Sequence, residues 1–140
     1  MRSIATILVS TMLLSACATG RNYSTRAELL SDPGSQVEIT SAMPVAQAFA
    51  LLRDLTFACF EFAHIRVYSE SPGPDGKGGS VTISTAQRIL DAKVVTTTLL
   101  APSDTGGTVA TIYSAGDKPP AAVLSRYPRW LGGGSKACNE

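Results

Sequence analysis

The chain has 140 residues, and its 12 Lys and Arg nearly balance its 11 Asp and Glu, for a formal net charge of +1 at pH 7. This length suits a single domain with a self-supporting hydrophobic core. The balanced charge excludes a nucleic-acid binder of the usual basic kind, and the low aromatic content, with one tryptophan, leaves little material for stacking bases or sugars.

The N-terminal segment has the layout of an export signal. Arg2 precedes an apolar run from Ile4 to Leu14, and Cys17 follows shortly after its end. The run is too short to span a hydrocarbon core of about 30 Å, whereas a basic start and a short apolar segment are typical of secretory signals. The alternatives are a conventional signal peptide with an incidental cysteine, or an N-terminal helix with a buried thiol.

The motif Leu14-Ser15-Ala16-Cys17 resembles the lipobox of bacterial lipoproteins. The resemblance implies that residues 1–16 are a signal peptide removed by signal peptidase II. It also implies that Cys17 is diacylated through its sulfur, with chains such as palmitate, and then acylated on its new amino group. Ala18, rather than Asp, after that cysteine implies transport to the outer membrane, where the domain faces the periplasm. Two or more acyl chains anchor a protein stably.

The segment after the lipobox lacks a clear hydrophobic period and contains Asp32, Pro33 and Gly34. Such a segment is expected to behave as a flexible coil. The predicted organisation is therefore a signal peptide over 1–16, a lipidated cysteine and tether over 17–34, and one domain over 35–140.

The hydrophobic period changes once in the first half of that domain. Residues 36–41 alternate apolar and polar side chains, which predicts a half-buried strand. From Pro44 to Phe60, apolar residues recur at steps of three and four, and Pro44 suits the first turn of a helix. We expect this helix to cover a sheet with its apolar stripe, on which Cys59 lies.

Four further strands are predicted after the helix. Alternation returns around residues 65–68, 81–85, 94–100 and 109–113, between short segments rich in turn residues. Connections this short favour an antiparallel meander, because parallel neighbours need a longer crossover. A short helix over residues 120–131, kinked or ended near Pro128, is expected last.

The predicted fold class is therefore α+β. It consists of an antiparallel sheet of about five strands in β-α-β-β-β-β order, with one main helix packed on one face and a short C-terminal helix. This outline is similar to small uncharacterised proteobacterial envelope lipoproteins.

The cysteines form an informative set once the lipobox resemblance assigns Cys17 to lipid. Cys59 and Cys138 then remain as an even pair in an exported chain, where cysteines are usually joined in disulfides. We expect a Cys59–Cys138 disulfide; two separate thiols are the alternative. A metal site is less favoured, because two distant cysteines and one histidine fall short of a zinc ligand set. No cofactor is expected.

Motifs that carry catalytic chemistry are missing from the sequence. His64 is the only histidine, and there is no nucleophile elbow, zinc-protease motif or redox cysteine pair. The Gly-rich segment 73–80 lacks the spacing of a phosphate-binding loop and is predicted to be a hairpin loop.

One cluster is a candidate for contact with a partner, namely Arg126, Arg129 and Trp130. Arg and Trp are among the residues most enriched in binding hot spots. Alternatively, Trp130 covers the sheet while both arginines face water.

These features together predict a non-catalytic lipoprotein that is anchored in the outer membrane and faces the periplasm. We expect it to dock an envelope protein or to act as an accessory subunit of an envelope complex. The alternative is a small inhibitor or ligand-binding module, for example one directed against a cell-wall hydrolase.

Overall fold

The computed structural model describes residues 21–62, 64–70, 78–86 and 92–139. In chain order its elements are α1 (Arg26–Ser31), β1 (Ser35–Ser41), α2 (Val45–Phe60), β2 (Ile65–Glu70), β3 (Gly79–Ala86), β4 (Ala92–Pro102), β5 (Thr108–Ser114) and α3 (Ala121–Leu131). The strands form one antiparallel sheet in the order β1-β5-β4-β3-β2. The predicted α+β class and the meander from β2 to β5 are therefore confirmed.

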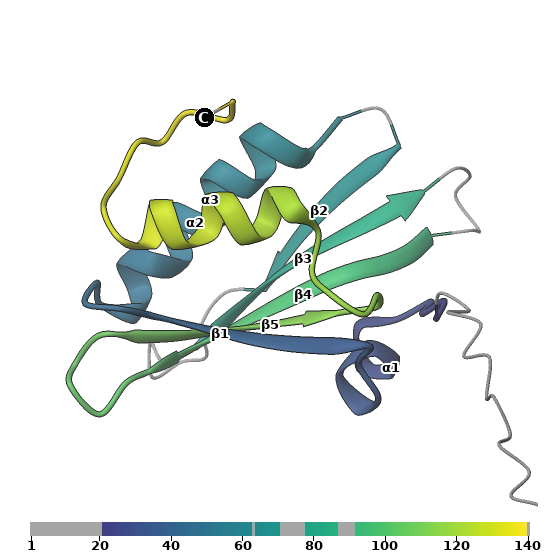
Figure 1. The fold of residues 1–140 in the computed structure, drawn as a ribbon, viewed down its shortest axis with the longest axis horizontal. Helices are drawn as coiled ribbons and strands as arrows, with labels where there is room; N and C mark the ends of the chain where they lie inside the picture. The colour runs from purple at the N-terminus through teal and green to yellow at the C-terminus, as the bar shows by residue number, and fades with distance from the viewer. Residues whose placement is uncertain (1–20, 63, 71–77, 87–91, 140) are drawn as a thin grey trace, which may run out of the picture.

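The two longer helices, α2 and α3, lie on one side of the sheet and α1 lies on the other (Figure 1). We call these sides the covered face and the open face. The apolar stripe of α2 follows the predicted helical spacing, and its buried residues are Ala48, Phe49, Leu52, Thr56 and Phe60. They join the main hydrophobic core with the inward residues of the strands, such as Val81, Ile83 and Ile112.

Helix α3 completes the covered face beside α2. It continues through Pro128 to Leu131, so the helix does not end at the proline. The Trp130 ring packs 5.7 Å from the Tyr127 ring and 6.4 Å from the Phe60 ring, measured between centroids. These aromatic contacts connect α3 to the end of α2.

A bulge in β4 changes which side chains face the open side. Thr96 pairs with Ile83, but Val94 pairs with Ser84, so Val95 is an extra residue in β4. The shift moves Val94 onto the open face, where it forms a second buried cluster with Tyr23 and Leu29.

The chain before β1 is folded onto this second cluster. Tyr23 forms a β-bridge with Val94, and Leu29 of α1 is fully buried. Thr25 and Glu28 start α1 as a capping box, in which each side chain bonds the other residue's backbone N–H. The prediction of a flexible tether up to Gly34 is therefore wrong for this part of the chain, because two buried side chains and a cap hold it on the sheet.

Candidate functional site

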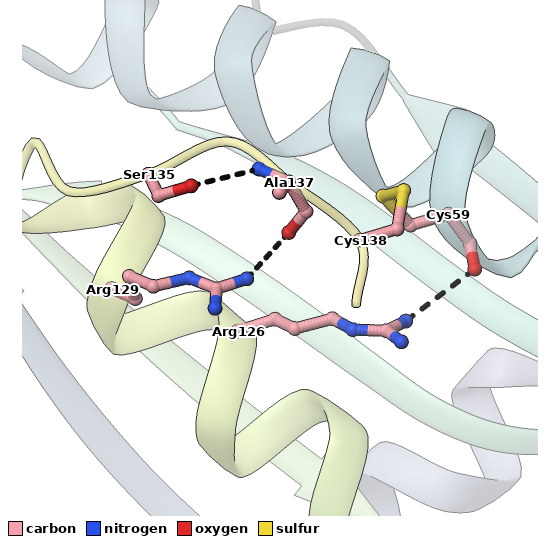
Figure 2. Close-up of a disulfide and its surroundings, with 6 residues drawn as sticks. All are labelled: Cys59, Arg126, Arg129, Ser135, Ala137 and Cys138. Atoms are coloured by element: carbon pink, nitrogen blue, oxygen red, sulfur yellow. Dashed lines mark hydrogen bonds between the residues drawn. A yellow bond between two sulfur atoms is a disulfide. The ribbon is translucent and has the colours of Figure 1, made fainter. Parts of the chain in front are cut away.

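The predicted disulfide is confirmed between Cys59, near the end of α2, and Cys138 in the C-terminal tail, with Cα atoms 5.3 Å apart (Figure 2). It joins residues separated by 79 positions in the sequence. In Figure 2 the tail residues Ser135 and Ala137 lie between α2 and the arginines of α3. The bridge thus fixes the tail across the top of the covered face.

Arg126 and Arg129, predicted as partner contacts, are placed by the structure next to this bridge. Arg126 Nη1 donates to the Cys59 carbonyl at 3.4 Å, and its guanidinium carbon lies 4.8 Å from the centroid of the Phe60 ring. Arg129 Nη2 donates to the Ala137 carbonyl at 2.5 Å (Figure 2). Both side chains are partly exposed, so their contact with a partner stays a prediction, beside a role in holding the tail.

Trp130 does not belong to an exposed cluster. Its side chain is 1% exposed, because it occupies the apolar side of α3 and packs on aromatic neighbours. The prediction of a partner contact is wrong for this residue, and the alternative, that it covers the sheet, is correct. Its neighbour Tyr127 is also fully buried, and this burial raises the pKa of its hydroxyl to about 12, although a hydrogen bond from Thr56 Oγ1 at 3.0 Å acts in the opposite direction.

A cleft of about 490 Å³ opens on the other side of the sheet, between the start of α1 and strand β2. Its volume lies in the range of small-molecule sites. The start of α1 forms one wall, β2 forms the opposite wall and β3 forms the floor. The described lining residues are Ser24, Thr25, Arg26, Ala27, Tyr68, Ser69, Glu70, Ser80, Thr82, Ser84 and Val94.

The floor of the cleft presents a row of hydroxyl groups, because Ser80, Thr82 and Ser84 occupy alternate positions of β3. Ser80 Oγ accepts a hydrogen bond from Arg26 Nη1 at 2.7 Å, and the Thr82 and Thr97 hydroxyls share one at 3.0 Å. Ser84 is 2% exposed, and its Oγ has no hydrogen-bond partner among the described residues. A buried hydroxyl without a partner is costly, and this Oγ lies beneath the surface of the cleft, out of contact with a ligand.

The walls of the cleft carry one ion pair and one aromatic ring. Arg26 Nη1 lies 2.5 Å from Glu70 Oε2, so the two charges compensate each other. Tyr68 is 57% exposed and pairs across the strands with Thr82. Directly paired residues on one face of a sheet are neighbours, so the Tyr68 ring stands beside the hydroxyl floor.

Sequence reasoning missed this cleft. Two signals were present, namely hydroxyl residues at every second position from Ser80 to Ser84 and the capping-box spacing of Thr25 and Glu28. The first marks a polar strand face, and the second marks a helix start. Only the pairing of β2 with β3 and the packing of α1 on the sheet make walls around that face.

Other features singled out in the sequence do not add to the site. Cys17 and residues 71–77 lie outside the described residues, and His64 is exposed just before β2. Within the described ranges, no group of three or more His, Cys, Asp or Glu side chains is arranged to hold a metal ion. None of the helices described is long and apolar enough to cross a membrane.

Comparison of the chain with protein-family models, curated proteins and solved structures found no match.

Proposed function

We propose that this chain is a non-catalytic lipoprotein of the bacterial outer membrane, which faces the periplasm and binds an envelope component through the open-face cleft. The lipobox motif ending at Cys17 supports the anchor. The observation that carries the binding role is the cleft of about 490 Å³, which is lined by the exposed Tyr68 side chain and the hydroxyl side chains of β3.

The short path from the anchor to the cleft supports this proposal. Ser24, in the cleft wall, follows Cys17 by seven positions, and an extended chain covers at most about 25 Å over that length. Because Tyr23 and α1 are held on the sheet, the free part of the tether is shorter than the sequence predicted. The cleft therefore lies close to the membrane surface once Cys17 is lipidated.

The chemistry of the cleft favours binding over catalysis. A catalytic hydroxyl needs an adjacent base that activates it. The described lining includes no histidine or cysteine, and its carboxylate, Glu70, is paired with Arg26. These groups suit recognition of a ligand by hydrogen bonds.

Intact-mass analysis of protein extracted from bacterial membranes tests the anchor. We expect a mature chain that begins at Cys17 and carries acyl mass, and we expect Cys17→Ser to leave an uncleaved precursor or an unanchored chain. Ala18→Asp is the matched variant, since it should leave lipidation intact and retain the protein at the inner membrane. Retention of Met1, or a mature chain that begins after Cys17, would contradict the proposal.

Docking of an envelope protein, as an accessory subunit, is a second candidate. Phe57 and Phe62 favour it, because their side chains are 54% and 77% exposed near the end of α2 and exposed aromatic groups are common in interfaces. Crosslinking in outer membranes distinguishes ligand binding in the cleft from docking of an envelope protein. Loss of a captured protein in Phe57→Ala and Phe62→Ala, with capture kept in Tyr68→Ala, would favour the accessory subunit.

A further inference from the structure

The open-face cleft has a composition that narrows the chemistry of its ligand. Its floor consists of the Ser80, Thr82 and Ser84 hydroxyls, which extend over about 13 Å of strand. Each hydroxyl both donates and accepts a hydrogen bond. A ligand that matches this row needs groups with the same double capacity along its length.

The charged residues that line the cleft, Arg26 and Glu70, disfavour an ionic ligand; Arg66, which pairs with Ser84 across the strands, is not part of that lining. Arg26 of α1 and Glu70 of β2 form an ion pair across the cleft, and Arg26 also donates to Ser80. A phosphate would have to compete with Glu70 for the guanidinium, and an amine would have to compete with Arg26 for the carboxylate. An uncharged ligand can form hydrogen bonds with the remaining polar atoms of Arg26 and Glu70 without breaking their ion pair.

An extended peptide is also disfavoured as the occupant. Strand β3, which forms the floor, is paired with β2 on one side and β4 on the other. Its backbone groups are therefore used within the sheet, and a peptide cannot add to it as another strand. The occupant must bind through side chains.

The Tyr68 ring completes the site. It is 57% exposed and stands across from Thr82, which places an apolar ring surface beside a row of hydroxyls. Pyranose sugars have the matching character, because their C–H groups form an apolar face and their hydroxyls form a polar rim.

We propose that the open-face cleft binds a short uncharged saccharide chain, whose sugar face stacks on Tyr68 and whose hydroxyls lie along the hydroxyl row of β3. This inference rests on the proposed function only in taking the cleft as the binding site; it does not depend on the lipid anchor.

Isothermal titration of the mature lipidated chain in a zwitterionic, sugar-free detergent tests the saccharide class. The probes are chitotetraose, maltotetraose and cellotetraose, with tetraalanine and inorganic phosphate as probes of the competing classes. We expect saturable binding of at least one saccharide and none of tetraalanine or phosphate. We expect Tyr68→Ala to weaken that binding about tenfold, the size of one aromatic contact.

Matched variants separate binding from folding. Phe62→Ala removes an aromatic ring that is 77% exposed and outside the cleft lining, and should leave binding unchanged. Thr96→Val removes a buried hydroxyl on the covered face, and should also leave binding unchanged.

Each outcome of the titration is decisive. Binding of phosphate or tetraalanine alone would overturn the saccharide class while keeping the cleft as a site. No binding of any probe, or saccharide binding that Tyr68→Ala leaves intact, would overturn this inference. The mass analysis of Cys17 would then still decide the anchor independently.

Discussion

The covered and open faces of the sheet differ in what fills them. On the covered face, large side chains such as Phe60, Tyr127 and Trp130 are buried together, and a disulfide joins α2 to the tail above them. On the open face, the second cluster of buried apolar side chains consists of Tyr23, Leu29 and Val94, and a hydroxyl-lined cleft lies beside it. The core of the covered face supplies most of the apolar burial, and this leaves the other face free for polar groups.

The strands couple the two faces. In β3, Val81 and Ile83 belong to the main core, whereas Ser80, Thr82 and Ser84 line the cleft. A slip of one residue in strand pairing exchanges these sets. The packing that stabilises the covered face therefore also fixes the hydroxyl row of the open face.

Removal of the disulfide should give the largest effect, and it should act on stability alone. Cys138→Ser should lower the free energy of unfolding by about 2–4 kcal/mol, because the bridge restricts the unfolded chain over a long loop. Chemical denaturation followed through the fluorescence of Trp130, the single tryptophan, measures this change. Ligand binding should be unaffected at temperatures where the variant is folded, because the cleft lies on the opposite face of the sheet.

Reductant provides the control for this comparison. It should destabilise the wild type to the level of Cys138→Ser and have no further effect on the variant. A variant as stable as the wild type would mean that the tail contributes nothing to the covered face. A loss of binding in the folded variant would mean that the two faces are not separable.

Much of the covered face was predictable from the sequence. The three- and four-residue spacing from Pro44 to Phe60 placed α2 and put Cys59 on its apolar side, and the even cysteine count gave the disulfide. Trp130 was harder to place, because a hot-spot composition and a core position have the same residue types. Its buried position follows from the orientation of α3 on the sheet, and the spacing of apolar residues in the sequence does not determine that orientation.

The open face was much less predictable. The bulge at Val95 reverses the alternation in β4, and a bulge has no strong sequence signal when all its residues are β-branched or small. Without the bulge, Val94 is not on the open face, and the cluster of Tyr23 and Leu29 keeps only its partly buried neighbours Tyr113 and Ala115. The cleft therefore depends on contacts between segments far apart in the sequence.

Alkaline pH should act on the covered face through Tyr127. The pKa of its hydroxyl is about 12 in the folded chain, against an ordinary value of 10.0. Burial disfavours the ionised form of this hydroxyl, so its contribution to the free energy of unfolding is fully present below pH 10. That contribution is lost as the pH rises toward 12, on the order of 2–3 kcal/mol in all. Denaturation midpoints between pH 9 and 12 measure this loss.

Tyr127→Phe is the matched variant for the pH experiment. It should be less stable than the wild type by about 1 kcal/mol near pH 7, because Thr56 loses its hydrogen-bond partner. Its stability should then fall less steeply above pH 10. Parallel pH profiles in the two proteins would show that Tyr127 does not control the alkaline loss.

The capping box of α1 should give the smallest effect, and that effect should be confined to the open face. Thr25→Ala removes the side chain that accepts the Glu28 backbone N–H at 3.2 Å, which typically costs about 1 kcal/mol. Because α1 is a six-residue helix held by Leu29, we expect local opening before the sheet unfolds. Hydrogen exchange should become faster in residues 26–31 and at the Val94 amide, which donates to the Tyr23 carbonyl.

Ser125→Ala in α3 is the control for this substitution, because it removes an exposed helical hydroxyl that bonds only a nearby carbonyl. Exchange in the strands of the main core should be unchanged in both variants. If Thr25→Ala instead speeds exchange equally in α1 and in β5, the two faces unfold as one cooperative unit. The open-face cleft would then share the full stability of the covered face, and α1 would be a fixed wall of the cleft instead of one that opens locally.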